Sequence, residues 1–186
     1  MRKLRSTYNS VVAAAIALFC GLMPAQGLAD QLDELFRQLA DPGTTNWETV
    51  ERDIEIQLSL SGSASADLLL RRGQDALEAQ DFDAAIDHLT ALTDHAPDFA
   101  EGYNSRAVAY FLAGLIGPAL DDLRHVLVLE PRHYGALAGI GSVMEELGDH
   151  EAALAAYRAA FAIHPHRADL HAAIARLERA TEGTAL

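Results

Sequence analysis

The sequence is short of two residues on which much protein chemistry depends. Among 186 residues it has one cysteine, Cys20, and one lysine, Lys3. A single cysteine excludes an internal disulfide framework and a cysteine-based zinc site. A lysine confined to the N-terminus leaves the body of the chain without lysine-based catalysis. These absences exclude small disulfide-bonded domains, cysteine-based zinc domains and enzymes that depend on a catalytic lysine.

Basic residues are also few relative to acidic ones. The chain has 27 acidic and 14 basic residues, which gives a formal net charge of −13. Binding to nucleic acid depends on clustered Lys and Arg near the phosphates, so this charge argues against a nucleic-acid partner. Half of the residues are hydrophobic, and at this length that composition predicts a folded, globular chain.

The first 29 residues have the pattern of a secretory signal peptide. Residues 1–10 carry three basic residues and no acid, residues 11–23 form an apolar run, and small residues stand at Gly27 and Ala29. This order predicts cleavage near Ala29/Asp30 and a periplasmic location. The chain would then touch a membrane only through the signal peptide, before cleavage. Losing three basic residues and no acid would move the net charge from −13 to −16.

Two other roles for this segment fit the sequence less well. A retained membrane anchor needs about 20 apolar residues to cross the hydrocarbon core, and the apolar run is shorter. A lipoprotein would use Cys20, but bulky Phe19 stands where a lipoprotein signal needs a small residue. Cleavage is therefore the preferred interpretation.

The body of the chain repeats with a period of 34 residues. Pro97, Pro131 and Pro165 are separated by this spacing, and alignment on them superimposes the blocks 66–99, 100–133 and 134–167. Each block is expected to fold as two antiparallel helices, for example Glu101–Ala113 and Pro118–Leu129. Three columns repeat in register: small (Gly73, Ala107, Gly141), alanine (Ala85, Ala119, Ala153) and large (Leu89, Leu123, Tyr157).

These columns have a direct physical meaning. A small residue on the first helix facing an alanine on the second lets the two backbones approach, and the large residue fills the space beside them. Glycine in the turn can adopt positive φ, and aspartate can cap the second helix. The sequence places Gly114, Gly148, Asp81 and Asp149 there. The stretch from Asp98 to Glu101 matches a capping box for the next first helix.

Helices are also expected on both sides of the repeats. Within residues 30–62, two amphipathic stripes are separated by Asp41-Pro42-Gly43 and predict a degenerate helical hairpin, followed by a connector at 59–63. The first stripe is Leu32, Leu35, Phe36 and Leu39, and the second is Trp47, Val50, Ile54 and Leu58. Residues 168–186 predict a capping helix and tail that cover the apolar end of the last repeat.

The period, the small, alanine and large columns and the closing proline resemble the tetratricopeptide repeat (TPR) family, in its secreted bacterial form. The resemblance covers three blocks of 34 residues. It implies an all-α fold, an α-solenoid of antiparallel helix pairs with three TPR units, an N-terminal hairpin and a C-terminal capping helix. It also implies a concave groove, lined by the first helices, that accepts a peptide or a helix.

Helical spacing along the first helices predicts the residues that line this groove. They are Leu70, Gln74, Leu77, Asn104, Val108, Phe111, Ala138, Ser142 and Glu145. Family members that bind acidic chaperone tails use a clamp of Lys, Arg and Asn. The corresponding positions here are Leu70, Gln74, Asn104, Gly135 and Gly139. Only Asn104 keeps the family's residue type, so the expected partner is a basic or apolar protein segment.

Other chemistries find little support. The glycines between Gly135 and Gly141 follow no strand and fall short of a phosphate-binding fingerprint. Histidines at 133, 164, 166 and 171 are expected to be solvated turn residues rather than metal ligands. Acid pairs lie on amphipathic helices, where charge marks the solvated face. We therefore expect no enzyme activity, no cofactor and no metal.

The resulting hypothesis is a non-catalytic adaptor or scaffold that binds a protein partner. The resemblance implies a role in periplasmic or envelope assembly. Two alternatives stay open: a module that forms homo-oligomers through exposed Leu and Phe side chains, and an accessory regulatory subunit of an envelope enzyme. A metal carrier using the histidines is a further and weaker alternative.

Overall fold

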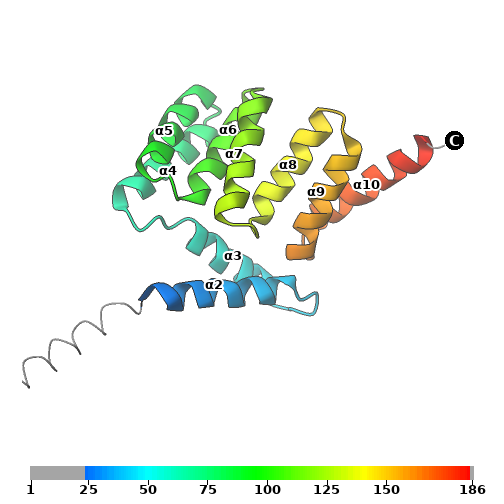
Figure 1. Ribbon diagram of the computed structural model, residues 1–186, viewed down its shortest axis with the longest axis horizontal. Coiled ribbons are helices and arrows are strands. Elements are labelled where there is room, and N and C mark those ends of the chain that lie inside the picture. The colour runs from blue at the N-terminus through cyan, green and yellow to red at the C-terminus, as the bar shows by residue number, and fades with distance from the viewer. Residues whose placement is uncertain (1–23, 185–186) are drawn as a thin grey trace, which may run out of the picture.

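The computed structural model describes residues 24–184, with side-chain environments over 30–180. Regular structure in this part of the chain is helical throughout. The helices are α2 (Pro24–Ala40), α3 (Trp47–Leu58), α4 (Ala64–Glu78), α5 (Phe82–His95), α6 (Ala100–Leu112), α7 (Ile116–Leu129), α8 (Tyr134–Glu146), α9 (His150–Ile163) and α10 (Ala168–Thr184). Figure 1 shows α4 to α9 stacked side by side as antiparallel pairs. The all-α fold class is confirmed.

The three 34-residue blocks correspond to the pairs α4–α5, α6–α7 and α8–α9. Each first helix packs on the second helix of its own pair, and consecutive first helices are neighbours. In the second block the observed helices run over 100–112 and 116–129, close to the expected bounds. The second of them begins before Pro118, because proline is tolerated within the first turn of a helix.

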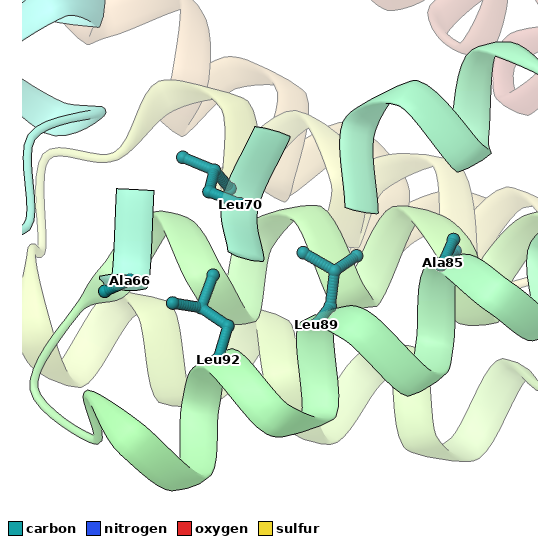
Figure 2. Packing of buried hydrophobic residues seen from close by; sticks show 6 residues of the cluster. Ala66, Leu70, Ala85, Leu89 and Leu92 are labelled. Carbon is teal, nitrogen blue, oxygen red and sulfur yellow. The ribbon is translucent and has the colours of Figure 1, made fainter. Parts of the chain in front are cut away.

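The repeating columns pack as complementary shapes. A Cβ atom added to Gly73 would lie 2.5 Å from Leu89 Cδ2, and one added to Gly141 would lie 2.5 Å from Tyr157 Cε1. The small residue therefore makes room directly for the large side chain of the partner helix, rather than only for the alanine. Figure 2 shows the first repeat, where Leu89 and Leu92 of α5 pack with Ala66 and Leu70 of α4.

The turns within the pairs follow the expected chemistry. Gly114 and Gly148 both have φ of 75°, which glycine adopts without a steric cost. The first pair has Gln80 at this position, with φ of 60°. Asp81 accepts a hydrogen bond from the backbone N–H of Ala84, and Asp149 caps α9 in the same way. Both predicted aspartate caps are confirmed.

The predicted capping box at the start of α6 is wrong. This helix begins at Ala100 with Phe99 at the N-cap, and no side chain there caps it. Asp98 lies one residue too far from the helix to accept from its first N–H groups. Glu101 instead turns toward its own helix, where it accepts hydrogen bonds from Asn104 and Ser105.

The N-terminal hairpin is α2 and α3, joined by residues 41–46 and connected to α4 by residues 59–63. It lies along one edge of the stack (Figure 1). Residues 1–23 of the predicted signal peptide are outside the described part of the chain, and the predicted cleavage point before Asp30 falls within α2. Within the described residues, the search for a helix long and apolar enough to span a bilayer found none.

Candidate partner-binding groove

The face formed by the first helices carries two hollows, one behind the other along α6. Glu101 and Asn104 line the first hollow, and Val108 and Phe111, one and two turns further on, line the second. We call the first the polar half of the groove and the second the apolar half. Their order follows the direction of α6, so one extended segment lying along this helix would meet both.

The polar half is a cavity of about 340 Å³ between the repeats and the hairpin. The repeats contribute polar and aromatic residues from three first helices and the turn before α8, and α3 forms the opposite wall. The lining residues are Gln74, Glu101, Asn104, His133, Tyr134 and Gly135 from the repeats, Glu55, Leu58 and Ser59 from the end of α3 and its connector, and Arg167 from the last turn.

A buried histidine organises this half. The Nδ1 atom of His133 accepts the backbone N–H of Ala136 at 3.1 Å and so caps α8. Its Nε2 atom must then carry the proton, and it lies 3.2 Å from Oε2 of Glu101. Because Glu101 also accepts from Asn104 and Ser105, its carboxylate is held in place at the cavity wall by three side chains.

The electrostatic balance of the polar half is acidic. Partial burial, together with repulsion from Glu51, raises the pKa of Glu55 above its usual value. Burial, with Glu55 nearby, raises the pKa of Tyr134, which therefore stays protonated. Arg167 is the one basic side chain in the cavity lining, and its guanidinium is paired with Asp169 at 2.6 and 2.7 Å. Two carboxylates thus face one cation that is already neutralised.

The apolar half is a hollow of about 160 Å³ between α6 and α8. Its floor includes Leu123, and its lining is Ala107, Val108, Phe111, Leu112, Gly139, Ser142 and Val143. Val108 is 43% exposed and Leu112 is 50% exposed. Both are large apolar side chains left in contact with solvent at the rim of a hollow, an arrangement typical of a surface that receives an apolar group.

The predicted groove residues separate into three groups. Gln74 and Asn104 line the polar half, and Val108, Phe111 and Ser142 line the apolar half. The remaining four lie elsewhere. Leu70 is 3% exposed in the core of the first repeat, Leu77 packs against the same cluster, and Ala138 packs against the last one; Glu145 is bound by Arg176 and Tyr157.

Leu70 and Glu145 depart most clearly from the expectation. Leu70 follows the apolar stripe of α4, and the packing of α4 on α5 turns that stripe inward. The carboxylate of Glu145 accepts from both terminal nitrogens of Arg176, at 2.5 and 2.9 Å, and this pairing lowers its pKa. Neither side chain is available to a partner in the groove.

The expectation that the turn histidines are solvated is wrong for two of them. His164 is fully buried and His133 is 5% exposed. Figure 1 places the hairpin beside the turns that carry them, and ring contacts to His164 come from Trp47 and Tyr134. A turn that is exposed within a repeat array becomes interior once another element covers it.

The sequence left open whether residues 30–62 cover the groove, and a buried ion pair behind the groove was not predicted from it. Arg106 donates to both carboxylate oxygens of Asp122, at 2.7 and 2.8 Å, and to Thr93 at 2.6 Å. This network joins α5, α6 and α7 and so positions the helix that lines both halves. A charged residue in the apolar register of α6, next to the small column, was the available signal.

Metal-ligating side chains were searched for in this part of the chain. Within the described residues, no group of three or more His, Cys, Asp or Glu side chains could hold a metal ion. His164 and His166 are close to each other, and the rings of both contact Trp47.

Comparison with known proteins agrees with the repeat pattern. The tetratricopeptide repeat family model matches residues 70–122 and 118–168. A TPR repeat-containing protein of Rhizobium etli is 34% identical over 138 residues, which is 73% of this chain and 67% of that protein.

Solved structures share the fold at lower identity. The first TPR of Spaghetti (RPAP3), solved with the HSP90 peptide SRMEEVD, is 22% identical with a TM-score of 0.62, over 64% of this chain and 95% of that one. The TPR2B domain of yeast Sti1, solved as a complex with pHsp70, is 19% identical with a TM-score of 0.59, over 63% and 98%. The chain belongs to the tetratricopeptide repeat family.

Proposed function

We propose that this chain is a non-catalytic adaptor that binds a segment of a partner protein along the face of its first helices. TPR domains mediate protein–protein interaction. The observation that carries the proposal is the apolar half, where Val108 and Leu112 leave apolar surface exposed beside a hollow. Burying one large apolar side chain there would contribute about 1.5–3 kcal/mol to binding.

The partner segment is basic or apolar rather than acidic. The polar half offers the carboxylates of Glu55 and Glu101, and Arg167 is occupied by Asp169. A peptide such as SRMEEVD, present in the RPAP3 structure, would bring three acidic side chains to this acidic wall. Like charges at close range raise the free energy of a complex, so this site would reject such a peptide.

The proposed setting is the bacterial periplasm, in envelope assembly. Its support is the signal-peptide pattern of residues 1–29, which predicts export and cleavage. Amino-terminal sequencing of the protein recovered from a periplasmic extract should begin at or near Asp30. Recovery with Met1 intact would contradict the proposed export.

Binding can be tested with a random peptide library selected on the full chain, followed by calorimetry of the selected peptides. Val108→Asp places a charge at the rim of the apolar half and should weaken binding by about a hundredfold, the effect of about 3 kcal/mol. Val128→Asp is the matched control, because Val128 is 76% exposed on α7, outside the groove. Equal losses in both variants, or binding that survives Val108→Asp, would contradict the groove assignment.

Self-association is a second candidate, favoured by the same exposed side chains. Leu112 and Val108 of one copy could be covered by the corresponding surface of another. Sedimentation at micromolar concentration distinguishes the two functions. A stable dimer that Val108→Asp dissociates would favour the oligomer, and a monomer that binds peptides would favour the adaptor.

A further inference from the structure

The hairpin α2–α3 contacts the repeats at their turns. Its side chains meet the segment 132–134 between the second and third repeats and the segment 163–167 after the third. From there the end of α3 reaches the first-helix face, where Glu55 and Leu58 line the polar half opposite Gln74 and Asn104. The hairpin therefore closes one side of the polar half, which remains a hollow of about 340 Å³, and takes no part in the lining of the apolar half.

The apolar contact of the hairpin forms a small core of its own. Phe36, Leu39, Val50 and Ile54 pack together with Tyr134 and, at the margin, Ile163. Among the described residues, the three clusters that hold the repeats together contain no hairpin residue. The repeats thus keep their own cores whether or not the hairpin is docked, which is the condition for a segment to detach as a unit.

The polar contacts of the hairpin are few and partly solvated. Asp33 pairs with Arg132 at 2.7 Å, but both side chains are substantially exposed, and such pairs contribute little. The ring of Trp47 stacks on His166 at 5.4 Å between centroids, and Nε2 of His166 lies 3.1 Å from the carbonyl oxygen of Asp41. These contacts orient the hairpin without anchoring it strongly.

His164 lies beneath the docked hairpin in an unfavourable state for a polar ring. It is fully buried between Trp47 and Tyr134, and neither ring nitrogen makes a hydrogen bond to any residue in the described part of the chain. Its Nε2 is 3.0 Å from Oε1 of Glu51, but without hydrogen-bond geometry. A buried imidazole without hydrogen bonds opposes docking, because undocking would return both nitrogens to water.

We infer that the hairpin α2–α3 is a displaceable cover that closes one side of the polar half of the groove and competes with the partner segment for Gln74 and Asn104 on the opposite side. This inference rests on the proposed function, because it assigns a regulatory element to the same site. With the cover docked, a partner can enter the polar half only from the side that α3 leaves open. With the cover detached, the groove is open from Gln74 and Asn104 to Phe111, and the full segment binds.

A release variant of the full chain tests whether the hairpin detaches. Trp47→Ala with Glu51→Ala removes the stacking ring and the carboxylate that face the last turn. The matched control is Glu48→Ala with Ile56→Ala, on the exposed side of the same helix. Two readouts need no partner: hydrogen exchange resolved by helix, and labelling of histidines by diethyl pyrocarbonate followed by mass spectrometry.

In the release variant we expect amide exchange in α2–α3 and labelling of His164 to rise by about tenfold, the effect of losing roughly 1.4 kcal/mol of docking free energy. Exchange in α4–α9 and labelling of exposed His150 should stay within about twofold of the wild type. Exchange rising equally in all helices would mean that the hairpin is part of the repeat core, and His164 staying protected would mean that it does not detach. Either result would overturn the inference.

A binding measurement tests the competition. A peptide selected on the release variant should bind the wild type about tenfold more weakly, because the wild type must first undock its hairpin. Equal affinities would contradict the inference that the hairpin competes with the partner, but they would not contradict binding in the groove. If no peptide binds either protein, the proposed function is wrong, and the hairpin has no partner with which to compete. Hydrogen exchange and histidine labelling then establish only whether the hairpin detaches.

Discussion

The two halves of the groove share α6 and α8 and differ in what lies opposite these helices. In the apolar half, Val108 of α6 and Ser142 of α8 face an open hollow. In the polar half, Asn104 and Gly135 of the same two helices face the end of α3. The halves thus differ because one lies next to the turns between repeats, where the hairpin docks. An element outside the repeats determines which part of a repeat surface is accessible.

The largest effect should come from breaking the feature that both halves share. Asp122→Ala leaves Arg106 buried without its carboxylate, and losing one partner of a buried pair costs about 3–5 kcal/mol of unfolding free energy. Because α6 lines both halves, Asp122→Ala should weaken the binding of a peptide to the polar half and to the apolar half alike. Urea denaturation measures the stability. The neighbouring Asp121→Ala is the control, since that side chain is mostly exposed; similar losses would contradict the role of the buried pair.

A smaller loss should affect the apolar half first. The Cβ of Gly141→Ala would lie within 3 Å of the Tyr157 ring, and such overpacking costs about 1–3 kcal/mol. The hydroxyl of Tyr157 is 3.1 Å from Ser142 Oγ, so displacement of the ring would distort the wall of this half. Thermal unfolding and peptide calorimetry measure the two effects. Gly117→Ala lies in α7 and meets open space, so it should leave peptide binding unchanged and raise stability by up to about 1 kcal/mol.

Acid should act on the polar half alone, through the hairpin. Burial lowers the pKa of docked His164 below its ordinary value of 6.5, although Glu51 opposes this and Arg167 and His166 reinforce it. When the hairpin is undocked, His164 regains its ordinary pKa, so the undocked state binds more protons. Docking is therefore at full strength above pH 6.5 and weakens as the pH falls below this value. Glu55 has the opposite effect on docking. Its pKa is raised in the docked state, so protonation of Glu55 favours docking, but this effect develops at lower pH, near the ordinary value of 4.5.

Trp47 is the only tryptophan in the chain, so its emission reports docking directly. Between about pH 7.5 and 5.5 we expect a shift to longer wavelength and greater quenching by acrylamide as the ring enters water. His164→Phe should abolish this transition, and His150→Gln should keep it. His166→Gln separates quenching by the stacked imidazole from undocking. A transition that persists in His164→Phe would contradict the role of that histidine.

The smallest effect should leave both halves unchanged. Gln80 has φ of 60°, where the other two repeats have glycine. Gln80→Gly removes the cost of a left-handed side-chain residue and should stabilise the chain by about 0.5–1 kcal/mol. Ala79→Gly is the control, because Ala79 has a right-handed backbone and should be destabilised by a similar amount. Peptide affinity should not change in either variant; a destabilised Gln80→Gly would contradict the strain at this turn.

The repeat architecture could be predicted because its determinants are local. Gly148 and Asp149 specify a turn and a cap through their own backbone and side chains, and the match of Gly141 to Tyr157 recurs at fixed spacing within one pair. Such interactions join residues that are close in sequence, so periodicity reveals them. Asn104 and Val108 were placed on the groove by the same argument.

Where the hairpin docks could be decided only by the tertiary structure. The amphipathic stripes of α2 and α3 show that each has an apolar face, but not which surface will cover it. Arg132 is 99 residues from Asp33, and His166 is 125 residues from Asp41. No spacing rule connects such pairs, because they depend on how the stacked repeats bring their turns to one edge. The sequence by itself determined a stack of helix pairs with a groove, and the packing of the hairpin determined which half of that groove has a second wall.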